Sequence, residues 1–176
     1  VLDPFCGVGT TPLVCQERGL ASCAVELNPL LHFVAKVKTT PVKNPAYLTT
    51  AAQEVIARSR SLFATFEGLD AETFLVDYHH SIPRIQNVAK WWSPVILKKL
   101  VALRIALADT SLPVDIADLV QLATVSILIE VSNARHNHPS LSFARSVKED
   151  APVFERFLKQ IEVMVHDLQG FPYARP

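Results

Sequence analysis

The residues best suited to chemistry lie near the start of the chain, in a short glycine-rich turn. Gly7 and Gly9 enclose a single residue, Val8, and two threonines follow them. Because glycine has no side chain and adopts a positive φ at little cost, such a turn lets the backbone approach a ligand closely. A helix that begins directly after the turn points its free N–H groups and the positive end of its dipole at that ligand. The pattern is typical of sites that hold a nucleotide-like cofactor.

A carboxylate follows at the distance that such a site requires. Residues 21–25 are small and mostly apolar, as in a short strand, and the strand ends in Glu26. In a strand–helix–strand unit, an acidic residue about 20 positions after the glycines accepts hydrogen bonds from a ribose. Glu26 lies 17 positions after Gly9. Asn28 and Pro29 then predict the start of another helix, because proline suits the first helical turn.

These strings resemble a known family, the class I S-adenosylmethionine-dependent methyltransferases. The resemblance is specific over residues 1–39 and is looser at residues 91–94 and 131–135. The Asp-Pro-Phe opening is most similar to the enzymes that methylate adenine N6 or cytosine N4 of DNA. The residues that carry the resemblance are Asp3-Pro4-Phe5-Cys6-Gly7-Val8-Gly9-Thr10-Thr11, Gly19 and Val25-Glu26-Leu27-Asn28-Pro29.

The resemblance implies S-adenosylmethionine as the cofactor and gives roles to the residues around the turn. Phe5 is expected to lie against the adenine and the methionine side of the cofactor, and Glu26 is expected to bind the ribose hydroxyls. Asp3, Gly7 and Gly9 are expected to shape the pocket around the amino-acid end. The complete set of cofactor-binding residues implied in this way is Asp3, Pro4, Phe5, Cys6, Gly7, Gly9, Thr10, Thr11, Glu26, Leu27 and Asn28.

The part of the active site that would hold the target base is not found in the sequence. The related enzymes use a loop of the type Asp/Asn/Ser-Pro-Pro-Tyr/Phe, whose polar residue binds the amino group while its ring stacks on the flipped base. That tetrapeptide is absent, and the nearest strings, residues 92–95 and 170–173, fit a helix cap and a turn better. A Pro-Cys nucleophile loop for cytosine C5 is absent too. We therefore assign no catalytic residue and expect a fragment that is inactive alone.

A second candidate site is the polar segment at residues 130–140, which follows an apolar run. Asn133, Arg135 and His138 are predicted to contact phosphates or base edges of a nucleic acid. The alternative is a helix C-terminus whose polar groups cap carbonyls and turn the chain. The sequence leaves both interpretations open.

Other polar and aromatic clusters have simpler explanations. The histidine pairs at 79–80 and 136/138 lack cysteine or acidic companions, so we expect surface histidines and no metal site. A tryptophan pair at 91–92 has faces on which bases could stack, but we expect a core anchor between helices. A solvated helix surface is expected for the basic group of Lys90, Lys98 and Lys99.

The composition limits the functional class of the protein and the cellular compartment in which it is expected. The 176 residues carry 17 basic and 17 acidic side chains, so no global basic field points to nucleic acid. This balance counts mildly against DNA binding by this piece alone. No uninterrupted apolar run of 18 residues is present, so no membrane-spanning helix is indicated. We expect a reduced, cytoplasmic protein with three buried cysteines, namely Cys6, Cys15 and Cys23.

The predicted fold class is α/β, a partial Rossmann-like methyltransferase fold with two N-terminal strands and a large, mainly helical segment. Residues 1–40 would begin the S-adenosylmethionine-binding domain, and residues 41–176 would form helices inserted before a missing catalytic half. Because only two residues precede Asp3, the chain is expected to be cut at its N-terminus. Apolar spacing and capping residues predict helices at 10–18 (with Thr10 or Thr11 as the cap), 29–38, 45–66, 95–108, 114–132 and from 152, and an irregular connection at 68–83.

The function inferred from the sequence is methyl transfer to an exocyclic amino group of a DNA base, adenine N6 or cytosine N4. DNA is then the expected partner, and a restriction endonuclease is a candidate partner. One alternative is an RNA methyltransferase, because enzymes that modify guanine N2 use a similar Asp-Pro-x-Cys-Gly-x-Gly-Thr turn. The other alternative is a non-catalytic helical binding module, in which a degenerate cofactor stub supports an interaction surface.

Overall fold

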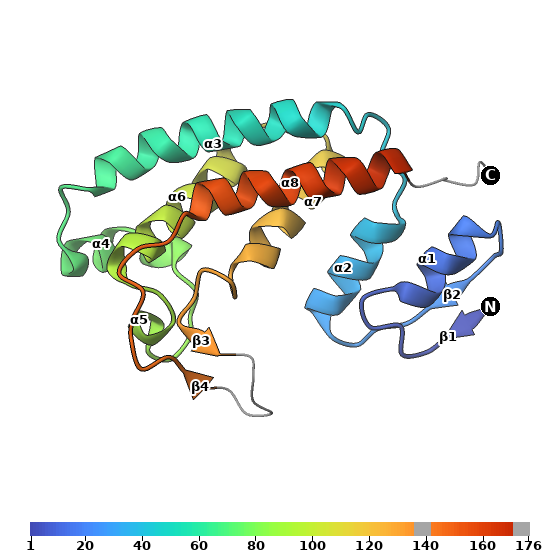
Figure 1. Ribbon diagram of the computed structural model, residues 1–176, viewed down its shortest axis with the longest axis horizontal. Coiled ribbons are helices and arrows are strands. Elements are labelled where there is room, and N and C mark those ends of the chain that lie inside the picture. The colour runs from blue at the N-terminus through green and yellow to red at the C-terminus, as the bar shows by residue number, and fades with distance from the viewer. Residues whose placement is uncertain (136–141, 171–176) are drawn as a thin grey trace.

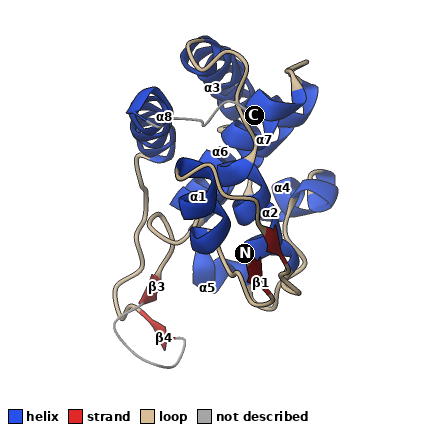
Figure 2. Ribbon diagram, turned by 90° about the vertical axis from the view of Figure 1, so that its right-hand side faces the viewer, coloured by secondary structure: helices blue, strands red, loops and turns tan. Residues whose placement is uncertain are grey.

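The computed structural model describes residues 1–135 and 142–170, and most of these residues lie in helices (Figures 1 and 2). The chain begins with a small unit that alternates strands and helices: β1 (Leu2–Asp3), α1 (Thr10–Glu17), β2 (Cys23–Ala24) and α2 (Pro29–Thr39). Figure 1 shows this unit at one end of the molecule, beside the long helices. The segment that follows contains α3 (Tyr47–Phe66), α4 (Ala71–Asp77), the 3-10 helix η1 (His79–Ser81), α5 (Val88–Trp91), α6 (Pro94–Asp109), α7 (Val114–Ile127), β3 (Ala134–Arg135), β4 (Ser142–Phe143) and α8 (Val153–Gly170).

The first two strands, β1 and β2, pair in parallel, with Leu2 opposite Cys23. The Val25 N–H extends the pair by donating to the Asp3 carbonyl (2.9 Å). Parallel strands require a crossover connection, and α1 provides it. The prediction of two N-terminal strands joined by a helix is therefore confirmed. Within the described ranges they form a two-stranded pair and no complete Rossmann sheet.

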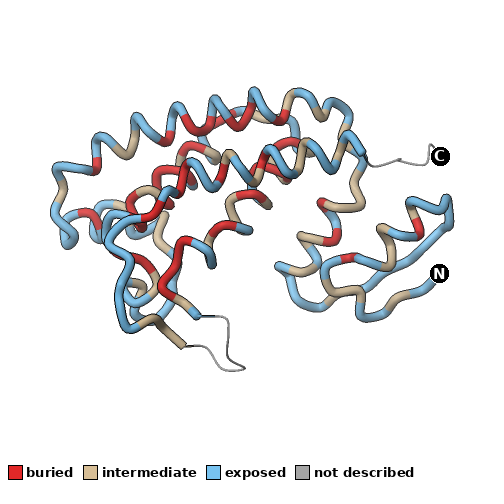
Figure 3. Tube along the Cα trace, viewed as in Figure 1, coloured by how far each residue is buried: buried red, intermediate tan, exposed pale blue. Residues whose placement is uncertain are grey.

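Four long helices, α3, α6, α7 and α8, enclose the core. α3 packs most extensively against α6, and α7 packs against α8. Figure 3 shows buried positions recurring along these helices, as expected when apolar residues are spaced three and four apart. Side chains with almost no exposure include Leu48, Val55, Ile96, Leu103, Ile116, Val120, Phe157 and Ile161.

The N-terminal unit is attached to this core through α2. Val37 is 4% exposed and belongs to the same apolar cluster as the long helices. Lys36 Nζ lies 3.1 Å from Asp118 Oδ2 on α7, and the Lys43 N–H donates to Asp115 Oδ2 (3.1 Å). Because solvent-exposed ion pairs contribute little to stability, the apolar packing of Val37 and of the partly buried Phe33 is the main link between the two parts.

The starts of the first two helices differ in how they are capped. Asn28 begins α2 as predicted, since its Oδ1 accepts a hydrogen bond from the Leu30 N–H (2.9 Å). The N-cap of α1 is Gly9, in the left-handed conformation and without a side-chain cap bond. The prediction that Thr10 or Thr11 caps α1 is therefore wrong. Both threonines lie inside the first turn of the helix instead.

The connection predicted as irregular at residues 68–83 contains two helices, α4 and η1. Asp70 begins α4, and its carboxylate accepts hydrogen bonds from the N–H and the hydroxyl of Thr73 (2.9 and 2.8 Å). These bonds, the backbone one foremost, hold the pKa of the Asp70 carboxyl below its usual range. Phe74 is buried against Phe66, with 5.3 Å between the ring centroids. The prediction was wrong because the Asp70 cap and the burial of Phe74 fix a helix of seven residues, which is too short to show a clear apolar period.

A second strand pair follows α7, which the sequence did not predict. α7 ends at Ile127, earlier than expected, and β3 and β4 pair antiparallel after it. The ring of Phe143 on β4 meets Trp91 edge-on, with 5.2 Å between centroids. The Trp92 Nε1–H donates to the Leu128 carbonyl (3.2 Å). The tryptophan pair thus anchors neighbouring elements, as predicted.

One of the lysines predicted to form a solvated surface is buried. Lys98 is 8% exposed, and its ammonium donates to the Leu69 carbonyl (2.6 Å) and lies over the ring of Phe74 (5.7 Å to the centroid). The long alkyl stem of lysine lets it pack in apolar surroundings while its charge reaches a carbonyl. The prediction of a solvated basic surface is therefore wrong for Lys98.

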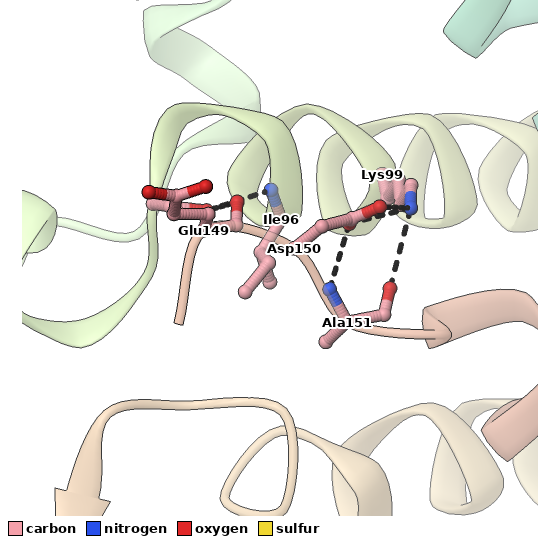
Figure 4. Close-up of polar contacts among 6 residues, drawn as sticks. Ile96, Lys99, Glu149, Asp150 and Ala151 are labelled. Carbon is pink, nitrogen blue, oxygen red and sulfur yellow. Dashed lines mark hydrogen bonds and ion pairs between the residues drawn. The ribbon is translucent and has the colours of Figure 1, made fainter. Parts of the chain in front are cut away.

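The segment before α8 is fixed to the start of α6 (Figure 4). Ser93 Oγ accepts the Ile96 N–H (3.3 Å) as the N-cap of α6, and the same hydroxyl donates to the Glu149 carbonyl (2.7 Å). One turn further along the helix, Lys99 Nζ lies 2.6 Å from Asp150 Oδ1. A single serine therefore caps a helix and holds a segment 56 positions away.

Replacing this serine tests whether the cap matters for stability. Ser93→Ala is expected to lower the free energy of unfolding by about 1–2 kcal/mol, since the Ile96 N–H loses its acceptor and the Glu149 carbonyl its donor. The measurement is urea denaturation followed by far-UV circular dichroism. Ser61→Ala on the exposed side of α3 is the matched control, with an expected change within about 0.5 kcal/mol. Equal losses of unfolding free energy in the two variants would contradict the stabilising role of the Ser93 cap.

Candidate cofactor site

The glycine turn lies directly after β1 and beside the end of β2. Gly7 and Gly9 both have a positive φ, +54° and +79°. The Gly9 N–H donates to the Cys6 carbonyl (2.9 Å), which closes the turn, and the Cys6 N–H donates to the Val25 carbonyl (3.0 Å). The turn is thus held against the carboxyl ends of both parallel strands, where ligands bind in open α/β sheets.

The two glycines serve different purposes. A Cβ placed on Gly9 would stand 2.8 Å from the Ala35 Cβ and 2.9 Å from its Cα, so Gly9 allows α2 to approach the turn. A Cβ placed on Gly7 would have no atom within 4 Å. The sequence pattern therefore combines a packing glycine with a glycine that leaves an open space over the turn, as a ligand would need.

Glu26 bridges the two turns that follow the strands. Its Oε2 accepts the Gly7 N–H (2.9 Å) and its Oε1 accepts the Asn28 N–H (2.7 Å). The carboxylate is half-buried. Because each carboxylate oxygen has two lone pairs, both oxygens can accept a further hydrogen bond, such as one from a hydroxyl. The acidic residue expected to bind a ribose therefore stands beside the glycine turn and retains acceptor capacity.

Lys38 is a residue of this site that the sequence reasoning missed. Its ammonium donates to the carbonyl of Val8, at the crest of the turn (3.0 Å). The bond fixes that carbonyl and brings a positive charge to the turn, which favours an anionic ligand group nearby. No local pattern marks this lysine, since the contact joins positions 30 apart in the chain.

Most of the remaining cofactor-binding candidates lie on the same rim. Asp3 ends β1, and its Oδ1 accepts the Phe5 N–H (3.1 Å). The side chain of Phe5 is 89% exposed and that of Leu27 is 95% exposed, so two uncovered apolar groups flank the turn and Glu26. Flat heteroaromatic rings pack well on such surfaces.

The cysteines differ from the prediction. Cys15 on α1 is buried, Cys6 in the turn is half-buried, and Cys23 on β2 is exposed. Three buried cysteines were expected, so the prediction holds for Cys15 alone. The error has a physical cause, since a pair of two-residue strands buries little surface, and both residues of β2 are exposed.

Two of the three predicted nucleic-acid residues, Asn133 and Arg135, are described, and they do not share an exposed surface. Asn133 is 2% exposed, its Nδ2–H donates to the Lys90 carbonyl (3.3 Å), and its Oδ1 accepts the Lys148 N–H (2.8 Å). In this arrangement the Asn133 amide joins α5 to the segment after β4 and is not presented to a base edge. Arg135 is exposed at the end of β3. His138 lies outside the described residues.

Neither a metal site nor a membrane-spanning helix is found among residues 1–135 and 142–170. No group of three or more His, Cys, Asp or Glu side chains in these ranges could hold a metal ion. The rings of His79 and His80 lie against one another, with 3.6 Å between centroids, and His79 Nδ1 is 2.8 Å from the Val76 carbonyl. Among the same residues, each helix is too short or too polar to cross a membrane.

The different roles of the two glycines can be tested with a matched pair of variants. Gly9→Ala is expected to destabilise α1 and α2 more than Gly7→Ala by about 1–3 kcal/mol, because both replacements strain a positive φ but only the first overlaps Ala35. The measurement is native-state hydrogen exchange of the amides in α1 and α2, which reports local opening. Equal loss of protection in the two variants would contradict the close packing of Gly9 on α2.

Comparison with known proteins does not assign the chain to a family. No family model, no curated protein and no solved structure matches it. The geometry of the turn and the resemblance of its motifs are therefore the grounds on which a function can be proposed.

Proposed function

We propose that the chain carries the cofactor-binding part of an S-adenosylmethionine-dependent methyltransferase that acts on an exocyclic amino group of a DNA base. The observation that carries the proposal is the contact between the Glu26 carboxylate and the Gly7 N–H at the carboxyl ends of two parallel strands. This contact joins the two parts of the motif that the sequence places 19 positions apart. In the proposal, residues 1–40 begin a Rossmann-like domain and residues 41–176 are a helical insertion.

The described residues fit the parts of this cofactor. The free acceptor capacity of Glu26 suits the two ribose hydroxyls, and the exposed ring of Phe5 suits the adenine. The open space over Gly7 admits the amino-acid end, whose carboxylate is favoured by the positive charge of Lys38. When bound, S-adenosylmethionine supplies a methyl group on a positively charged sulfur. The residues of this chain bind and orient the methyl donor.

The assignment to DNA rests on the resemblance of the Asp3-Pro4-Phe5 opening to the amino-methylating enzymes. Adenine N6 and cytosine N4 are the target atoms in this proposal, and DNA is the partner, with a restriction endonuclease as a candidate companion in the cytoplasm. No catalytic residue is proposed, because the sequence contains no Asp/Asn/Ser-Pro-Pro-Tyr/Phe loop that would hold the target base. Methyl transfer from labelled cofactor to DNA or to tRNA, measured with an intact enzyme that contains this chain, distinguishes this proposal from an RNA methyltransferase.

One observation favours a second candidate, the non-catalytic helical binding module. Nearly all of the apolar core belongs to α3, α6, α7 and α8, so the helical segment does not depend on the turn for its packing. In this alternative the turn binds no cofactor. Calorimetry with S-adenosylhomocysteine separates the two candidates.

The contribution of Glu26 is measured in the same calorimetric experiment. Glu26→Ala is expected to weaken the affinity for S-adenosylhomocysteine about 10- to 100-fold, because the ligand loses hydrogen bonds to a charged carboxylate. Glu17→Ala, at the exposed end of α1, is the matched control and should leave the affinity unchanged. Circular dichroism verifies that both variants keep their helices. Absence of binding by the unsubstituted protein, or unchanged affinity in Glu26→Ala, would refute the proposed site.

The role of Lys38 is tested against its neighbour on the same helix. Lys38→Met is expected to weaken the affinity for S-adenosylhomocysteine about 3- to 30-fold, because the Val8 carbonyl loses its donor and the turn loses a positive charge. Lys36→Met removes an exposed lysine that pairs with Asp118 and should change the affinity less than about twofold. Titrations at two salt concentrations test the contribution of the charge, since added salt should reduce the difference in affinity between Lys38→Met and the unsubstituted protein. Equal effects of the two substitutions would contradict this role.

A further inference from the structure

A cavity of about 480 Å³ lies in the helical segment, away from the glycine turn. It opens between α6 and α7 and is bordered on one side by the residues around η1. Its volume falls within the range of about 300–1,000 Å³ that is usual for small-ligand sites. Its apolar walls include Trp92, Leu97, Leu100, Val101, Leu107 and Leu128.

The apolar walls are held in place by the core. Leu97 and Val101 are 5% and 2% exposed, and their helix packs extensively on α3. The hydrogen bond from Trp92 Nε1–H to the Leu128 carbonyl (3.2 Å) joins two wall residues from different elements. A cavity with walls fixed in this way needs little rearrangement to receive a ligand, which reduces the cost of binding.

Polar groups gather on the α6 and α7 residues that line the same cavity. Arg104 on α6 is exposed and donates one N–H to the Ser81 carbonyl (3.0 Å), so most of its five N–H donors remain available. Gln121 and Thr124 on α7 line the cavity as well. The Thr124 hydroxyl donates to the Val120 carbonyl (3.0 Å) and keeps its acceptor lone pairs.

The surroundings of Arg104 differ from those of the other arginines on the long helices. Arg58, Arg60 and Arg156 each lie within 4.0 Å of a glutamate carboxylate. Arg104 has no such carboxylate among residues 1–135 and 142–170. A guanidinium fork beside an apolar cavity, without an acidic side chain of its own, is complementary to a carboxylate that carries an apolar body.

We infer that the cavity between α6 and α7 is a binding site for a small amphiphilic carboxylate, with an alkyl or aromatic body against Trp92 and Leu100 and its carboxylate on Arg104. Burial of the apolar body away from water supplies the affinity. The charge of Arg104 supplies the selection among head groups. The site is independent of the glycine turn and of the proposed methyl transfer.

The chain contains its own reporter for this site. Its two tryptophans are Trp91 and Trp92, and the second lines the cavity. Titration with sodium decanoate, kept below the concentration at which it forms micelles, should give a saturable change in tryptophan emission. Decan-1-ol and decyltrimethylammonium have the same apolar body with a neutral and a positive head group. Each is expected to bind about tenfold or more weakly than decanoate.

Two substitutions and a control locate the ligand. Arg104→Gln is expected to reduce decanoate affinity about tenfold, and Ala108→Phe, at the exposed rim of the cavity, should weaken all three probes. Arg58→Gln is the matched control, since Arg58 also donates to a helix-end carbonyl (Asp109, 3.1 Å) but does not line the cavity. The affinity of the Arg58→Gln variant for decanoate should equal that of the unsubstituted protein. Absence of saturable binding, equal affinity for the three head groups, or equal effects of the two arginine substitutions would overturn the inference.

Discussion

The close approach of Gly9 to Ala35 is the constraint on which the candidate site depends. Any side chain at position 9 would overlap α2, and α2 is the helix that attaches the turn to the rest of the molecule. Within four positions, α2 contacts Gly9 through Ala35, enters the common core through Val37 and holds the Val8 carbonyl through Lys38. The geometry of the turn and its two short strands therefore depends on the helical core, which α2 joins through Val37.

This dependence explains how a parallel pair of two short strands can hold an ordered turn. Two strands alone bury too little surface to be stable. Here the Glu26 carboxylate joins the two strand ends at Gly7, and the packing of α2 restricts the remaining motion of the turn. Cofactor binding, as proposed, would add contacts to an arrangement that already exists, so little binding energy would be spent on ordering the turn.

The parts of the fold that the sequence predicted correctly are those with local signals. Asn28-Pro29 and Ser93-Pro94 mark helix starts because the capping side chain and the proline act on their own first turn. The turn at Gly7 and the carboxylate after β2 were likewise predicted from adjacent residues and known spacing. Lys98 was misjudged and Lys38 was missed because their partners, Leu69 and Val8, lie far away in sequence. The two interpretations of Asn133 stayed open for the same reason, since its partner Lys148 is also distant. Burial of a polar side chain depends on such distant partners, and composition does not reveal them.

The way that α8 completes the core has a consequence for synthesis of the chain. Phe154 on α8 packs edge-on against Phe63 on α3, and Arg60 and Glu155, 95 positions apart, meet beside them. On a ribosome, α3 would leave the exit tunnel long before α8 is made, with part of its apolar surface still facing water. At typical elongation rates of about 5–20 residues per second, that interval lasts several seconds. During it, α3 and α6 cover only part of each other's apolar surface, and the positions that α8 later covers can associate with other chains.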